Sequence, residues 1–396
     1  SPDRRIFRLK QPANFLSIRR MNRLGQSCRS ASNFGTAKLT ALTLASSLLI
    51  GCHSFGPDSL MGTHPLYNDA INQSINDQFL QNLVRLHYRD PTFFLDVVNV
   101  AATLKLDIYG GLDQSTVGLN GTANDILKFS AGTNYTTQPV ISYSPMQGED
   151  FVKSLMVPIS LQALFALSNS GWSAIRLYGL IIEHINGLDN APTASGPRPD
   201  VAPEHDAEFN EFLAVMEQLR GTRTVFARNL TDPNKAELII TAKFEPQCAA
   251  KVARLKELLS LNPDLETYKL VTDFTLAGGD TVAISTRPLM SILYYLSHHI
   301  DTPKEHLDDG LVRLTRNPNG TPYDWGLSPV GRWFHIQQNE KRPEQAFLSV
   351  PYRDRWFFIS DRDLDSKATF TLLTQLFRLQ AGSAKPIMPT LTLPVK

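Results

Sequence analysis

The sequence predicts an α+β fold with a mainly antiparallel sheet and interspersed helices, divided into two subdomains. Runs of β-branched and aromatic residues joined by short turns indicate strands, as at 270–276 and 280–287 on either side of Gly278-Gly279. Stretches with apolar residues at helical spacing separate these runs. The 396 residues are 42% apolar and 19% charged, which is typical of a folded globular protein.

The N-terminal half begins with a helix. Residues 68–90 carry Ile75, Phe79 and Leu83 at helical spacing, and Pro91 should end this helix near Asp90. One or two strands are expected at 93–110, then a turn or flexible loop at 109–137, which is rich in Gly, Thr and Asn, and a strand at 139–146.

Residues 148–188 predict two or three helices. The last of them carries Ile175, Leu177, Tyr178, Leu180, Ile181, Ile182 and Ile185. Because it is apolar on much of its circumference, we expect it to be buried or to face another subunit. The segment 191–203 holds four prolines and few large apolar residues, so it is interpreted as a linker between a region at 52–190 and one at 204–396.

The C-terminal region alternates helices and strands. Helices are predicted at 204–220, 247–261, 288–300 and 365–380, and strands at 222–229, 236–244, 270–276, 280–287, 332–338, 346–352 and 355–361. Strands joined by short turns favour antiparallel pairing.

The N-terminus has the pattern of a lipoprotein signal peptide at 21–51. A basic segment ends at Lys38, and about a dozen apolar or small residues follow, too few to span a bilayer. The run Leu49-Ile50-Gly51-Cys52 resembles the lipobox of bacterial lipoproteins, in which the cysteine thiol receives a diacylglycerol and becomes the mature N-terminus. An ordinary signal peptide or an uncleaved anchor is the alternative. Residues 1–20 are expected to be upstream sequence translated by mistake, or else a long basic segment.

This pattern predicts lipidation of Cys52 and a position in the bacterial cell envelope. His53 follows the cysteine where an Asp would retain the protein at the inner membrane, so the address resembles that of the outer membrane, periplasmic side. Two or more acyl chains hold a protein durably on a membrane. Of the other cysteines, Cys28 lies in the signal peptide and Cys248 should open a helix as a structural residue.

The charge distribution gives no footprint for nucleic acid. Residues 1–51 hold nine of the 39 Lys and Arg and one of the 38 acidic residues, so residues 52–396 carry a net charge of −7. A mildly acidic body is not typical of proteins that bind DNA or RNA. We therefore expect no nucleic-acid partner.

No common catalytic motif occurs in the sequence: GxSxG, the P-loop, HExxH and GxGxxG are all missing. Asp361, Asp363 and Asp365 have the spacing of the first ligands of a calcium loop, but Ser366 and Leu372 stand where that loop needs Gly and Glu. We interpret these acids as caps of the helix that follows. No catalytic, cofactor-binding or metal-ligating residue is assigned.

Two further groups are weighed for chemistry. His298 and His299 end a helix, where an imidazolium would complement the carbonyl ends, but adjacent histidines point about 100° apart and cannot share one metal. The other candidate histidines, which are His87, His184 and His335, are not spaced four residues apart on a helix, as two ligands of one metal would be. A charged hairpin tip, formed by Arg353, Asp354 and Arg355, lies between two predicted aromatic strands. We expect the aromatic residues to pack in the core on one face of this hairpin, and a binding edge is the alternative.

Several stretches together resemble an uncharacterised family of bacterial lipoproteins. They are "YNDAINQSINDQFLQNLVRLHYRDPTFFLDV", "ISYSPMQGEDFVKSLMVPIS", "STRPLMSILYYLS" and "WFFISDRDLDSKATFTLLTQLF". His87 stands where the family frequently has Arg. The resemblance implies an exported, lipid-anchored protein and no particular chemistry.

The sequence thus predicts a lipid-anchored, periplasm-facing envelope protein with a structural or interaction role and envelope proteins as partners. No cofactor is expected. The alternatives are an envelope hydrolase that uses Asp361 and Asp363, and a small-ligand binding protein with its cleft between the two halves.

Overall fold

The computed structural model describes residues 55–119, 122–197, 202–203, 207–232 and 234–381. The chain forms two compact units, Ser1–Leu66 and Tyr67–Lys396. The segments expected at 1–20 and 21–51, with Leu49, Ile50, Gly51 and Cys52, lie outside the described residues. Their interpretation as a lipoprotein signal stays a prediction.

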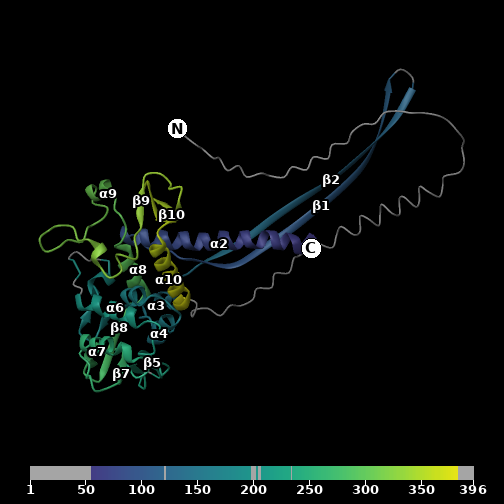
Figure 1. Cartoon of the computed structure of the whole chain (residues 1–396). Helices are drawn as coiled ribbons and strands as arrows, with labels where there is room; N and C mark the ends of the chain where they lie inside the picture. The colour runs from purple at the N-terminus through teal and green to yellow at the C-terminus, as the bar shows by residue number, and fades with distance from the viewer. Residues whose placement is uncertain (1–54, 120–121, 198–201, 204–206, 233, 382–396) are drawn as a thin grey trace, which may run out of the picture. The chain divides into compact units, whose positions relative to one another are not determined.

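The α+β class is confirmed in the second unit (Figure 1). The largest sheet in the described part of the chain has the strand order β4-β3-β8-β7-β6-β5, in which only β7 and β8 run parallel. Its strands are β3 (Ile182–Ile185), β4 (Leu188–Asp189), β5 (Val225–Arg228), β6 (Glu237–Ile240), β7 (Thr267–Val271) and β8 (Thr281–Thr286). The expectation of a mainly antiparallel sheet therefore holds.

A second sheet has the order β10-β11-β9 and is antiparallel. Its strands are β9 (Gln337–Asn339), β10 (Ala346–Tyr352) and β11 (Arg355–Ser360). Leu348, Val350, Phe357 and Ile359 are buried, which confirms core packing on one face of the predicted aromatic hairpin. Arg353 and Asp354 at its turn both have positive φ, as in the tight turns that connect hairpins.

Further helices lie between the strands and after the last of them. They are α3 (Glu149–Met156), α4 (Leu161–Asn169), α5 (Ala174–Ile181), α6 (Ala207–Leu219), α7 (Ala249–Leu258), α8 (Leu289–Ser297), α9 (Lys304–Asp308) and α10 (Leu364–Ala381), with 3-10 turns η2 (Pro192–Ser195), η3 (Pro246–Cys248), η4 (Phe274–Leu276) and η5 (Trp325–Leu327). Helix α8 packs against α3, α10 and η2, and α6 packs against α5 and α7.

Helix α2 (Phe55–His87) confirms that an N-terminal helix is present and ends three residues before Asp90, but it begins at Phe55, before the expected start at residue 68. Phe79, Leu80, Leu83 and Val84 are buried on one face, as their helical spacing requires. No helix among the described residues is long and apolar enough to cross a bilayer.

An aromatic cluster joins α2 to the far end of the chain. The ring centroid of Phe377 on α10 lies 4.5 Å from that of Phe79 and 5.1 Å from that of Phe94. Phe151 on α3 lies 5.9 Å from Phe94. All except Phe151 are buried, so this cluster ties the start of the first strand to three helices.

Strands β1 (Leu95–Leu119) and β2 (Thr122–Pro145) form a long antiparallel hairpin (Figure 1). The prediction of a loop at 109–137 is therefore wrong. Gly, Thr and Asn are depleted in strands, so composition alone predicts a loop here, but the described residues of this stretch pair in a continuous ladder. Between the strands the sequence has Asn120-Gly121, the dipeptide that two-residue hairpin turns favour.

The helix expected through Ile185 is also wrong in part. Helix α5 ends at Ile181, and Ile182 and Ile185 belong to β3, which pairs with β8. An unbroken apolar run is compatible with a buried helix and with a buried strand. Here the pairing with a strand distant in sequence determines that Ile182 and Ile185 lie in a strand. The expected burial is confirmed, since Leu177, Leu180 and Ile181 are fully buried.

Arg287 holds residues 191–195, the start of the segment expected as a linker, against the sheet. Its guanidinium, which is wholly buried, donates to the carbonyl oxygens of Ile182 (3.0 Å) and Ala191 (3.3 Å) and to Oγ of Ser195 (2.9 Å). Strands from both sides of this segment share one sheet. The segment expected as a linker thus lies inside one compact unit, and Ala191 and Ala194 are buried in it.

Candidate functional site

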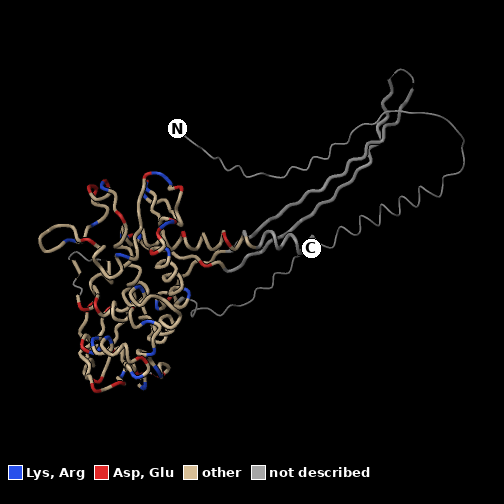
Figure 2. Tube along the Cα trace, in the orientation of Figure 1, with Lys and Arg blue, Asp and Glu red and all other residues tan. Residues whose placement is uncertain are grey.

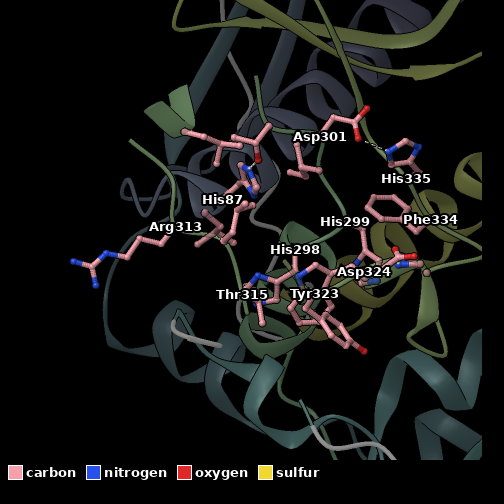
Figure 3. A pocket seen from close by; sticks show the side chains of 18 of the residues that line it. His87, His298, His299, Asp301, Arg313, Thr315, Tyr323, Asp324, Phe334 and His335 are labelled. Carbon is pink, nitrogen blue, oxygen red and sulfur yellow. Dashed lines mark hydrogen bonds and ion pairs between the residues drawn. The ribbon is translucent and has the colours of Figure 1, made fainter. Parts of the chain in front are cut away.

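A cavity of about 470 Å³ lies among the end of α2, the end of α8 and the loop that carries η5 (Figure 3). Its lining includes His87, His298, His299 and His335, with Asp301 and Tyr323. Four of the chain's nine histidines thus meet at one place. We take this cavity as the candidate site because it gathers titratable groups in a concave surface.

His87 lies in the last turn of α2 and connects it to the end of α8. Its Nδ1 is 2.9 Å from the carbonyl oxygen of Ser297, and its Nε2 is 2.8 Å from Oγ1 of Thr302. Burial lowers the pKa of His87 to about 4. The ring is therefore neutral at physiological pH, with both nitrogens bonded to the scaffold.

His299 is bonded in the same way. Its Nδ1 lies 3.0 Å from the carbonyl oxygen of Tyr295, one turn earlier, and its Nε2 lies 2.8 Å from Oγ of Ser328. Burial lowers the pKa of His299 to about 4. The sequence had suggested an imidazolium at this helix end, but the cost of burying a charge keeps the ring neutral.

His298 caps α8 and stacks on the indole of Trp325, with ring centroids 4.6 Å apart and an interplanar angle of 17°. Burial is the main cause that lowers its pKa to about 3, and the neighbouring His299 and His87 contribute to this shift. Its Nε2 is buried without a hydrogen-bond partner in the described part of the chain. The ring therefore lies flat against the indole at the end of α8.

His335 differs from the other three. Its Nε2 lies 2.8 Å from Oδ1 of Asp301, and Figure 3 shows the two side chains joined at one side of the cavity. The hydrogen bond to Asp301 raises the pKa of His335. The site therefore combines three neutral imidazoles with one ring that favours the charged form.

The loop behind Trp325 leaves no room for a larger residue at Gly331. A Cβ at this position would lie 2.1 Å from the carbonyl oxygen of Trp325 and 2.7 Å from Cα of Gly326. The backbone closes on itself here only because Gly331 has no side chain. This close approach shapes the wall of the cavity that carries Trp325.

Charged groups at the cavity have structural partners or face outward. Asp324 accepts a hydrogen bond of 2.8 Å from the backbone N–H of Gly326 and so caps η5. The guanidinium of Arg313 points away from the histidines in Figure 3. Among the described residues, no group of three or more His, Cys, Asp and Glu side chains is arranged to hold a metal ion.

The carboxylates considered from the sequence lie outside this cavity and make structural contacts. Asp363 accepts a hydrogen bond of 3.0 Å from the N–H of Ser366 at the start of α10, which confirms the capping interpretation for this one of the three acids. Asp361 pairs with Lys367 at 2.7 Å, and Asp365 pairs with Arg176 at 2.7 Å. Their side chains are not brought together into one site.

The remaining candidates also make contacts within the fold. Cys248 is buried in the core at the end of η3, which agrees with a structural role. Arg353 donates a hydrogen bond of 2.9 Å to Asp90, and Tyr352 also donates to that carboxylate. Burial opposes the charge of Asp90, but these hydrogen bonds outweigh it and lower the pKa. The hairpin tip is thus tied to the end of α2.

Sequence reasoning did not find the cavity. His87 and the pair His298 and His299 are separated by more than two hundred positions, and no periodic pattern connects them. The single local signal is His298-His299 itself, which the sequence presents both as a charged helix end and as a candidate metal site. Comparison with protein-family models, with curated proteins and with solved structures finds no match. The resemblance to a lipoprotein family therefore stays a prediction.

Proposed function

We propose that this chain is a lipid-anchored envelope protein on the periplasmic side of the outer membrane, with a structural or interaction role. The sequence Leu49-Ile50-Gly51-Cys52 after a short apolar run supports the anchor. The mixed surface charge supports a protein partner over nucleic acid. Figure 2 shows acidic and basic residues interspersed along the described chain.

The observation that carries the interaction role is the β1–β2 hairpin. Each strand pairs with the other over its whole length, and no other described strand pairs with either outer edge. An isolated two-stranded hairpin is marginally stable in water. A partner that packs against this long hairpin would therefore stabilise it.

The structural contacts of the carboxylates weigh against the hydrolase alternative. Asp363 caps α10 and Asp361 forms an ion pair with Lys367, so neither presents an uncommitted carboxylate to the cavity. A pair of carboxylates acting as acid and base needs both groups to face one substrate.

Membrane fractionation tests the anchor. The chain is expressed from Met21 as wild type, as Cys52→Ala and as Cys28→Ala, the last being a matched control within the expected signal peptide. The wild type and Cys28→Ala should appear in the outer-membrane fraction, and Cys52→Ala should leave it. An equal distribution of all three proteins would contradict the proposal.

The cavity favours one second candidate, the binding of a small uncharged ligand. The imidazoles of His87 and His299 line the cavity without adding charge, and Tyr323 and Thr302 place hydroxyl groups beside them, in a volume suited to a small molecule. Glucose serves as a first probe in a thermal-shift measurement. A rise in Tm that is lost in Thr315→Phe, which narrows the cavity, supports this candidate, and the absence of any rise for the wild type counts against it.

A further inference from the structure

Residues 316–322 form a small hairpin directly before Tyr323, which lines the cavity. Arg316 and Pro322 make a β-bridge at its base. The tip, residues 318–321, is exposed to solvent. The hairpin is therefore ordered by its own hydrogen bonds, while the side chains at its tip are open to reaction with water.

Asn319 and Gly320 lie in the turn at this tip. The N–H of Gly320 donates to the carbonyl oxygen of Asn317 at 2.8 Å, and Gly320 has a φ of 83°. Apart from its chain neighbours, no described atom lies within 4 Å of the point that a Cβ would occupy at Gly320. Because the tip is exposed, local opening of this hydrogen bond gives water access to the Gly320 nitrogen, which no side chain shields.

The side-chain oxygen of Asn319 accepts hydrogen bonds from two donors of one residue. The backbone N–H of Thr321 donates to Oδ1 of Asn319 at 3.0 Å, and Oγ1 of Thr321 donates to the same atom at 2.6 Å. Nδ2 of Asn317 donates to Oγ1 of Thr321 at 3.0 Å, so this hydroxyl accepts from one side and directs its single proton at Asn319. Two donors on one carbonyl oxygen polarise its carbon, as in an oxyanion hole. Cγ of Asn319 is therefore activated toward a nucleophile.

We propose that Asn319 is a site of spontaneous deamidation through an intramolecular imide. The Gly320 nitrogen gives its proton to hydroxide and forms a bond to Cγ of Asn319. The bond from Cγ to Nδ2 then breaks, and this nitrogen takes a proton from water and leaves as ammonia. Water then opens the five-membered ring. Cleavage of the new bond at Cγ gives aspartate, and cleavage at the main-chain carbonyl gives isoaspartate.

The reaction changes both the charge and the geometry of the hairpin. Either product replaces a neutral carboxamide by a carboxylate, and the isoaspartyl product also adds one methylene to the main chain between Asn319 and Gly320. Because this hairpin leads into the loop with Tyr323 and Trp325, the change lies beside the wall of the cavity. The modification goes beyond the proposed function and depends on neither the anchor nor a partner.

Asn186-Gly187 places the same dipeptide in a protected setting. Nδ2 of Asn186 donates to the carbonyl oxygen of Leu259 at 2.6 Å, and Oδ1 accepts from the N–H of Ala283 at 2.8 Å. Asn186 is half-buried, and its own N–H donates to the carbonyl oxygen of Ala283 at 3.0 Å. These bonds hold the carboxamide between β8 and the end of α7, so Cγ is not free to turn toward the Gly187 nitrogen. Asn186 is therefore a control within the same molecule.

Peptide mapping of the full chain tests the proposal. The folded protein is incubated in mildly alkaline buffer and digested at acidic pH. Mass spectrometry then identifies the exchange of NH2 for OH, and electron-transfer fragmentation separates aspartate from isoaspartate. Asn319 should convert several times faster than Asn186 in the folded protein, and the two should convert at similar rates in urea. Equal rates in the folded protein, or an intact Asn319 after the unfolded chain has converted, would overturn the proposal.

Two variants test the hydroxyl of Thr321. Thr321→Val removes the Oγ1 donor and keeps the backbone donor, so conversion of Asn319 should slow several-fold in the folded protein and stay unchanged in urea. Thr321→Ser keeps the hydroxyl and should convert like the wild type. The rate at Asn186 in the same digests shows whether either variant has unfolded. Equal rates for Thr321→Val and Thr321→Ser in the folded state would contradict the activation of Asn319 and with it the proposal.

Discussion

Arg287 donates a hydrogen bond of 3.0 Å to the carbonyl oxygen of Ile182, the residue at which α5 changes into β3. The same guanidinium bonds to the segment that follows β4, and its Cζ lies 4.5 Å from the ring centroid of Tyr295. One buried side chain thus satisfies several backbone groups where the chain leaves regular structure.

Replacement of Arg287 should be strongly destabilising. Arg287→Met keeps the apolar stem but leaves buried carbonyl oxygens without donors, and we expect the free energy of unfolding to fall by about 3 to 5 kcal/mol. Arg313→Met, an exposed arginine at the cavity, is the matched control and should change it by less than about 0.5 kcal/mol. Urea unfolding measures both, and equal effects would refute the role of Arg287.

The fold class and most elements follow from the sequence because they depend on local pattern. Helix α2 and helix α10 show their buried faces as residues spaced three and four apart, and Pro91 marks the first boundary. The hairpin and β3 do not follow, because their identity depends on distant partners. Ile182 is a strand residue because it pairs with Thr286 of β8. The Gly- and Thr-rich stretch forms strands because β1 and β2 pair with each other.

The cavity could not be predicted for a related reason. His87 reaches the other histidines through the packing of α2 against the end of α8, which the sequence does not encode at any fixed spacing. Their pKa values depend on burial, which is a property of the assembled unit. The capping role of Asp363, in contrast, is local and was predicted.

Stability should fall on mild acidification. The pKa of His299 is about 4 in the folded protein against about 6.5 in an unfolded chain, so below pH 6.5 the unfolded state binds the proton first. This stability is complete above about pH 6.5 and is lost as pH falls toward 4, at a cost of about 3 kcal/mol for this one residue. The urea midpoint measured from pH 7 to pH 4 should therefore decrease.

His299→Gln keeps a neutral polar group at this position and removes the titration. The decrease in the urea midpoint between pH 7 and pH 4 should be smaller in this variant than in the wild type. His87 and His298 contribute in the same direction, so part of the dependence remains. An identical pH dependence in the two proteins would show that His299 is not the neutral buried group described here.

His335 should behave in the opposite sense. Because Asp301 raises its pKa, the folded state binds the proton more tightly than the unfolded state. Its contribution to stability is present below pH 6.5 and is lost as pH rises through the raised pKa. Asp301→Asn should lower the pKa of His335, as followed by the NMR shift of its Hε1 proton. An unchanged pKa in the variant would exclude the pair as the cause.

The carboxylates before α10 allow a test of structure against chemistry. Asp363→Ala removes the cap and should lower the free energy of unfolding by about 1 kcal/mol. Asp361→Ala breaks an ion pair near the surface, which should cost less than about 0.5 kcal/mol. Thermal unfolding of both variants decides this order. A loss of function in either variant at unchanged Tm would favour the hydrolase alternative.

The central claim is that Cys52 carries lipid and places the protein at a membrane surface. Intact-mass spectrometry of the membrane-extracted protein, expressed from Met21 beside Cys52→Ala, tests it most directly. The account predicts a mature mass that begins at Cys52 and includes acyl chains, and the loss of that species in Cys52→Ala. An unacylated mass that begins at another residue would contradict it.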